Sequence, residues 1–169
     1  MGYALREHTA DVAVEATGDT IGTAFAAAAN GMAAAMCQDI PDGAGDRHTV
    51  AVAAESREAL LFDYLDRLIY ERDVRSVLPV ENTGRITSPE GYTSNNGATG
   101  TDGRHTGDGP GAGAAPSGDP AAGAWRFEGG YRGVSLARVD ARDLKAVTYS
   151  EMTIEETAQG WRVYVVFDV

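Results

Sequence analysis

The spacing of hydrophobic residues along this chain predicts strands and helices in succession. In "DVAVEA" (11–16) every second residue is apolar and faces one side of an extended chain, which is the period of a strand. From Ile21 the apolar residues recur every three and four positions, up to about Gln38, which is the period of a helix. Thr20 directly precedes this stretch and is a suitable N-cap, so we expect a strand, a turn and a helix.

The same pattern continues in the middle of the chain. "RHTVAVA" (47–53) predicts a second strand, and Ser56 is the expected N-cap of a second helix. The apolar stripe of that helix is formed by Leu60, Leu61, Tyr64, Leu65, Leu68 and Ile69. "SVLPVENTGRIT" (76–87) predicts a further strand, and its Pro79 indicates an edge position or a bulge.

The C-terminal part consists of strand patterns only. "WRFEGGYRGVSLARVD" (125–140) predicts one or two strands, and residues 144–169 predict a hairpin with its turn at Gln159-Gly160. Two helices and six or seven strands, arranged in runs, indicate an α+β fold. We therefore expect a single-domain sandwich of mostly antiparallel sheet with two main helices, spanning residues 1–169.

Residues 88–124 interrupt this pattern. Gly, Ala, Ser, Thr, Asn, Asp and Pro dominate the segment, and Tyr92 is its only aromatic residue. Such a composition buries too little apolar area to offset the entropy lost on ordering. We expect a flexible insertion between two strands and not a domain boundary.

The charge and composition of the chain indicate which partners and which environment it is suited to. The formal net charge is -11, from 25 acidic and 14 basic residues, which argues against a direct electrostatic grip on nucleic acid. Lys145 is the only lysine, and an acidic surface poor in lysine is typical of adaptation to high salt, where repulsion between like charges is screened. Cys37 is the single cysteine and is expected to be a small buried residue. There is no long apolar run and no secretion signal, so we expect a cytoplasmic protein without membrane contact.

Three candidate functional residues stand out, although the common phosphate-loop, serine-hydrolase, zinc-protease and paired-cysteine motifs are absent from the sequence. Asp11, with His8 beside it, begins a strand, and Asp168 ends the last strand. If these two strands are neighbours, the two carboxylates can share a hard cation such as calcium or magnesium. The alternatives are a turn at Asp11 that satisfies main-chain donors and a solvated chain end at Asp168.

Lys145 is the third candidate. All other basic Lys or Arg positions of this protein are arginine, and only this one is lysine. The ammonium group of lysine is compact and strongly hydrated, whereas the guanidinium group of arginine is planar. A site that needs a point charge would resist replacement by arginine. Chance survival of one lysine is the alternative.

Three segments, in this order, resemble the archease family. "HTADVAVEATGDTIGTAFAAAANGM" (8–32) is similar to the family's opening, with an HTAD-type start, a strand, a glycine turn and an amphipathic helix. "LLFDYLDRLIYERD" (60–73) resembles its second helix. Residues 144–169 resemble its end, a KAVTY-type motif followed by a strand that finishes in Asp and one aliphatic residue. The resemblance covers nearly the whole chain outside 88–124.

The resemblance implies a small cytoplasmic protein that assists the RtcB-type RNA ligase, which joins tRNA halves after intron removal. By this resemblance it is not an enzyme: it promotes guanylylation and multiple turnover of the ligase, broadens its nucleotide use, and meets tRNA halves only through the ligase. The implied metal ligands are Asp11, Asp168 and a main-chain or terminal oxygen of Val169, with calcium the expected divalent cation. The resemblance implies that Lys145 is a functional position, and His8, beside Asp11, is the second candidate for ligase activation.

The chain also departs from the family pattern. Ser150 stands where many relatives have histidine, and Asp63 and Asp66 replace a Glu and Asn pairing. Two other functions remain open: a small metal-dependent phosphoesterase, for which no base or nucleophile is visible beside the ligands, and a chaperone-like modulator of an RNA-modifying enzyme.

Overall fold

A computed structural model of the chain describes residues 1–8, 11–43, 45–89 and 123–169. In chain order its elements are β1 (Gly2–His8), β2 (Asp11–Gly18), α1 (Ile21–Met36), β3 (Asp46–Ala54), α2 (Arg57–Arg75), β4 (Val77–Thr87), β5 (Trp125–Ser135), the 3-10 helix η1 (Leu136–Arg138), β6 (Ala146–Thr157) and β7 (Gly160–Asp168). The strands form a four-stranded sheet in the order β1-β2-β7-β6 and a three-stranded sheet in the order β3-β5-β4. All neighbouring strands are antiparallel, which confirms the predicted α+β fold.

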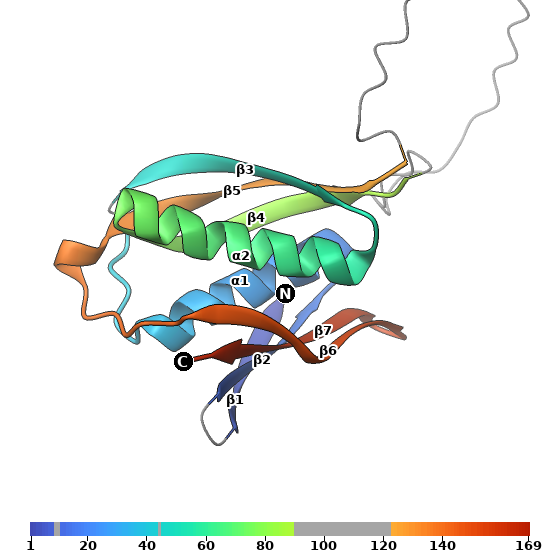
Figure 1. The fold of residues 1–169 in the computed structure, drawn as a ribbon, viewed down its shortest axis with the longest axis horizontal. Helices are drawn as coiled ribbons and strands as arrows, with labels where there is room; N and C mark the ends of the chain where they lie inside the picture. The colour runs from blue at the N-terminus through green and yellow to red at the C-terminus, as the bar shows by residue number, and fades with distance from the viewer. Residues whose placement is uncertain (9–10, 44, 90–122) are drawn as a thin grey trace, which may run out of the picture.

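The two helices lie between the two sheets, so the molecule has three layers (Figure 1). α1 packs on β2 of one sheet and β4 of the other, while α2 packs on β6 and β3. The inner side chains of both sheets and the helices form one hydrophobic core. The predicted sandwich is therefore confirmed, and the helices form its middle layer.

The position of α1 between two sheets explains its alanine-rich sequence. Most of its residues are buried, on every side of the helix, which is typical of a helix enclosed in a core. Small side chains let both sheets approach it closely. The predicted N-cap is confirmed: the Thr20 hydroxyl accepts from the main-chain N–H of Thr23, and the Thr23 hydroxyl accepts from that of Thr20. The helix ends at Met36, two residues before the predicted end.

α2 shows the predicted amphipathic pattern. All six residues of its apolar stripe are buried. The Ser56 hydroxyl accepts from the main-chain N–H of Ala59 at 3.1 Å, so the expected N-cap is confirmed.

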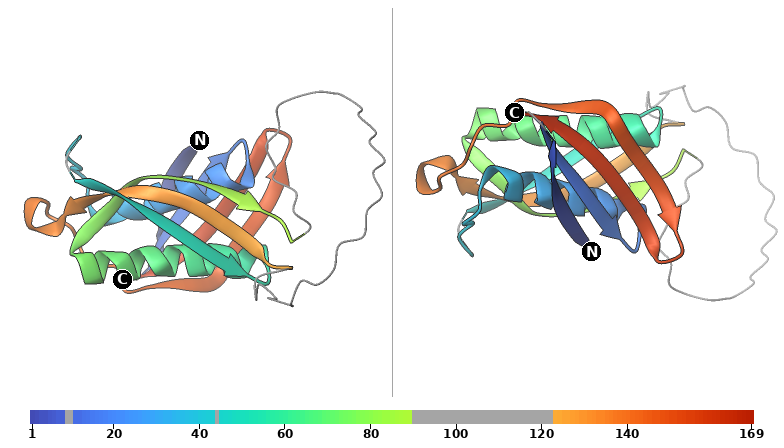
Figure 2. Two further views of the ribbon diagram at one scale, coloured as in Figure 1. Left: turned by 90° about the horizontal axis from the view of Figure 1, so that it is seen from above. Right: turned by 90° about the horizontal axis from the view of Figure 1, so that it is seen from below.

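The four-stranded sheet contains one strand that the sequence analysis missed. Seen from below, β1 forms one edge and β6 the other, with β2 and β7 between them (Figure 2). We predicted no strand before Asp11, because only Tyr3 and Leu5 alternate in β1 and two positions do not establish a period. The C-terminal hairpin is confirmed, but its turn residues are Ala158 and Gln159, and Gly160 already begins β7 with a φ of 128°.

The three-stranded sheet tests the predictions made for Pro79 and for the strand pattern at 125–140. β4 is an edge strand, and its register against β5 shifts between Val80 and Thr83, so the edge and the bulge indicated by Pro79 are both present. Residues 125–135 form one strand and not two. A side chain at Gly129 would come within 2.0 Å of the Thr83 carbonyl oxygen, so glycine is required where these strands meet.

The predicted insertion falls between β4 and β5, whose adjoining residues Thr87 and Arg126 are register partners. Of that segment, residues 90–122 lie outside the described residues, so its predicted flexibility stays a prediction. Cys37 is buried and unpaired, as predicted. In the described ranges, none of the helices has the length and apolar character needed to cross a membrane.

Candidate functional site

The two candidate aspartates lie side by side at one end of the four-stranded sheet. Asp11 begins β2, Asp168 ends β7, and the two are direct partners in the antiparallel register. Directly opposite residues in such a pair point to the same face, with Cβ atoms roughly 5 Å apart. Asp11 is half-buried and Asp168 is exposed. The condition set by the sequence analysis, that the two strands be neighbours, is met.

Lys145 is fixed at the same end of the sheet. Its main-chain N–H donates to the carbonyl oxygen of Asp168 at 2.9 Å, directly before β6 begins. The preceding residue, Leu144, is buried, and its carbonyl accepts from the Arg72 guanidinium at 3.0 Å. The backbone of Lys145 is therefore held from both sides, while its side chain is exposed.

His8 and Val169 occupy neighbouring positions. His8 ends β1 and is the register partner of Asp11, although its side chain lies outside what the structure describes. Val169 follows Asp168 and is 37% exposed. The ends of all four strands thus bring the five sequence-predicted residues to one end of the sheet.

The two carboxylates supply oxygen ligands for a cation, but they do not complete a metal site by themselves. Like charges directly opposite each other in a sheet destabilise it, and a cation between Asp11 and Asp168 would remove that cost. Carboxylate oxygens are the ligands that calcium and magnesium prefer. Within residues 1–8, 11–43, 45–89 and 123–169, no group of three or more His, Cys, Asp or Glu side chains is placed to hold a metal. The remaining ligands would have to be main-chain oxygens, water or a partner.

A stacked aromatic pair lies between α2 and β6. The rings of Phe62 and Tyr149 are 4.3 Å apart and nearly parallel, and Tyr149 is 55% exposed. Partial burial, and then the neighbouring Asp66, raise the pKa of the Asp63 carboxyl. Partial burial, and then Asp63, also raise the pKa of Tyr149. Asp63 and Asp66 are exposed, and they make the surface beside this pair acidic.

A buried ionic cluster in the C-terminal half of α2 was not predicted from the sequence. Glu71 is only 3% exposed, and its carboxylate accepts from the Tyr131 hydroxyl at 2.9 Å and from Arg67 and Arg75. Burial alone would raise the pKa of Glu71, but these hydrogen bonds outweigh it and lower the pKa. Burial and the hydrogen bond to Glu71 raise the pKa of Tyr131 to about 12. The only signal in the sequence was a glutamate with arginines four residues before and after it.

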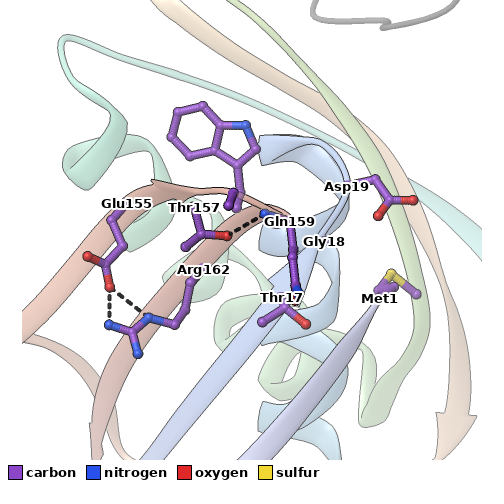
Figure 3. A pocket seen from close by; sticks show the side chains of 10 residues that line it. Met1, Thr17, Gly18, Asp19, Glu155, Thr157, Gln159 and Arg162 are labelled. Carbon is purple, nitrogen blue, oxygen red and sulfur yellow. Dashed lines mark hydrogen bonds and ion pairs between the residues drawn. The ribbon is translucent and has the colours of Figure 1, made fainter.

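A hollow of about 550 Å³ lies at the opposite end of the same strands (Figure 3). Its lining includes Gly18 and Trp161, the last register pair of β2 and β7. Arg162 and Glu155, also in the lining, bind each other in an ion pair. The hollow is thus separate from the Asp11–Asp168 end.

The fold and this sheet end define a small three-layer α+β protein whose candidate residues gather where four strands end. The sequence matches the model of the Archease protein family (MTH1598/TM1083) over residues 3–106 and 117–169. The chain therefore belongs to the archease family, as its three motifs indicated. A search of curated proteins found no significant match.

Two solved structures have a similar fold. One is the solution structure of protein 1598 from Methanobacterium thermoautotrophicum, with a TM-score of 0.67, 19% identity, and 99% of each chain covered. The other is the crystal structure of an archease from Thermotoga maritima, described as a possible chaperone. It has a TM-score of 0.55 and 17% identity, and the match covers 97% of this chain and 94% of that one. At these identities the comparison shows the shared fold alone.

Proposed function

We propose that this protein is a non-catalytic activator of an RtcB-type RNA ligase, promoting guanylylation and multiple turnover of the ligase. The observation that carries the proposal is the convergence of Asp11, Asp168 and Lys145 at one sheet end in a chain of the archease family. An exposed lysine at the same end of the sheet as two carboxylates suits docking onto a charged site of another protein.

The net charge supports a protein partner. A ligase that binds RNA needs a basic surface, because phosphate contacts dominate RNA affinity. A chain with a net charge of -11 is attracted to such a surface and repelled by RNA itself. The tRNA halves would then be reached only through the ligase.

A divalent cation, with calcium the expected ion, would complete the site. Asp11 and Asp168 would hold it, together with an oxygen of Val169, and the bound ion would supply positive charge beside Lys145. The role of the chain is to fix the two carboxylates on one face and to hold the Lys145 backbone next to them.

Calcium titration followed by calorimetry tests this part of the proposal. We expect the wild-type protein to bind one calcium ion per chain, and Asp11→Asn and Asp168→Asn each to weaken binding by at least about tenfold, because each removes a charged ligand. Asp46→Asn, which alters an exposed aspartate of β3 in the other sheet, is the control and should bind as wild type does. Equal binding by all four proteins would show that these carboxylates are not the ligands.

Guanylylation of the cognate ligase tests the activator role. Formation of the ligase–guanylate adduct from GTP should become faster when the wild-type protein is added. Asp168→Asn should restore the slower rate while leaving the fold intact, as checked by circular dichroism. An unchanged rate with wild type would contradict the proposal.

A chaperone-like role is the second candidate, because the Thermotoga maritima structure with this fold is described as a possible chaperone. It predicts broad suppression of aggregation of unrelated proteins and no effect on ligase guanylylation. The two assays therefore separate the candidates.

A further inference from the structure

β1 offers an edge for pairing with another strand. It lies at one end of the four-stranded sheet and, within the residues that the structure describes, pairs only with β2. Its first part, Gly2 to Leu5, carries no charged side chain. Tyr3 is 47% and Leu5 48% exposed, so two large apolar side chains stand at this edge.

The opposite edge of the same sheet is protected against pairing. β6 carries Glu151, Glu155 and Glu156, and its register against β7 shifts between Thr148 and Thr153. Charges, bulges and covering helices are the usual devices that prevent edge-to-edge association. β1 has no proline, no lysine and no register shift in its seven pairs with β2.

The exposed side chains of β1 face the helix layer. Tyr3 and Leu5 pair with Ala16 and Val14, which belong to the core beside α1. A side chain at Gly31 of α1 would come within 3.2 Å of the Tyr3 ring, so one side of this ring rests on the helix. Tyr3 as a whole is still 47% exposed, and a neighbour on the free edge would cover it further.

We propose that two copies of this chain associate through β1, paired antiparallel about a two-fold axis at Ala4, so that the two four-stranded sheets become continuous. In this register Tyr3 lies opposite the partner subunit's Leu5 on the helix-facing side, and Leu5 lies opposite the partner subunit's Tyr3. The two-fold axis therefore forms the contact between Tyr3 and Leu5 twice. Together the two contacts cover both apolar side chains of each copy.

The same register avoids electrostatic conflict. The residues at the centre of the contact, Tyr3, Ala4 and Leu5 of each copy, are all uncharged. This self-complementarity is why we assign the edge to a second copy and not to a different protein. The two-fold axis also points the two Asp11–Asp168 ends in opposite directions, which leaves both accessible. The inference does not depend on the proposed function.

The net charge predicts how salt affects this association. Two chains of -11 repel each other at a distance, and salt screens that repulsion, while the contact itself is apolar. The dimer should therefore be favoured as salt rises. An interface held by ion pairs would show the opposite dependence.

Light scattering coupled to gel filtration tests the proposal on the full chain. In about 1 M KCl we expect twice the mass of a single chain, with a larger single-chain fraction at about 0.15 M. Leu5→Lys should give the single-chain mass at both concentrations. Val74→Lys, at an apolar α2 residue that is 57% exposed, adds the same charge elsewhere and should still form the dimer.

Cross-linking tests the register directly. Cα atoms opposite each other in an antiparallel pair are about 4.5–5.5 Å apart, which a disulfide can span. With diamide as oxidant, Ala4→Cys should form a covalent dimer, while wild type should not, because its only cysteine, Cys37, is buried. A single-chain mass at both salt concentrations, a dimer that survives Leu5→Lys, or no cross-link at residue 4 would each overturn the proposal.

Discussion

Lys145 has a fixed backbone and an exposed side chain, which is the arrangement expected of a residue that presents a charge to a partner. We predict that Lys145→Arg weakens stimulation of the ligase by at least about tenfold, because a charged hydrogen bond is worth roughly 1.5–3 kcal/mol and the planar guanidinium does not reproduce ammonium geometry. The measurement is the guanylylation rate at saturating GTP.

The control for this exchange is Arg138→Lys, which makes the reverse substitution at an exposed residue of η1. It should stimulate the ligase as wild type does. Full stimulation by Lys145→Arg would mean that this lysine is a chance survivor in an arginine-rich chain.

Glu71 is expected to stabilise the folded protein. We predict that Glu71→Gln lowers the free energy of unfolding by roughly 1–3 kcal/mol, since it weakens a buried carboxylate's hydrogen bonds to Tyr131 and two arginines. Urea denaturation at neutral pH measures this loss. Glu156→Gln, at an exposed glutamate of β6, should change stability little.

The same cluster predicts a pH dependence. The hydrogen bonds hold the pKa of Glu71 below its ordinary value of 4.5, so its contribution is complete above that value and disappears as pH falls through the lowered folded-state pKa. The stability difference between wild type and Glu71→Gln should therefore shrink in acid. A difference that stays constant down to the acid transition would exclude this role.

At the scale of elements, the N-cap of α2 is a local signal that works as predicted. Ser56→Ala should cost about 1 kcal/mol, because it leaves the main-chain N–H of Ala59 without its partner. Ser135→Ala is a matched control: Ser135 precedes η1 but makes no capping hydrogen bond through its side chain. Thermal unfolding of both variants should separate them, and equal melting temperatures would argue against the cap.

The elements also show where sequence reasoning succeeds and fails. Both helices, their N-caps and the strands from β2 onward follow from hydrophobic period and capping residues, which are local properties of the chain. β1 was missed because an edge strand half exposed to solvent needs no sustained alternation. The buried position of Glu71 was missed because it depends on Tyr131, which lies sixty residues away on β5.

At the scale of the whole molecule, the order of strands determines the candidate site. The sequence placed an aspartate at the beginning of one strand and another at the end of a second, and left open whether the strands meet. Their register pairing, and the hydrogen bond from Lys145 to the Asp168 carbonyl, arise from the β1-β2-β7-β6 order, which no local pattern reveals. The resemblance to the archease family did imply that Asp11 and Asp168 belong to one site, and therefore that their strands are neighbours.

Multiple-turnover joining of tRNA halves by the cognate RtcB-type ligase, at high salt with and without this protein, is the most direct test of the activator role. With the ligase limiting, we predict many ligations per enzyme molecule in the presence of the protein and few in its absence. Equal turnover under both conditions, with a ligase shown to be active in a single cycle, would contradict that role.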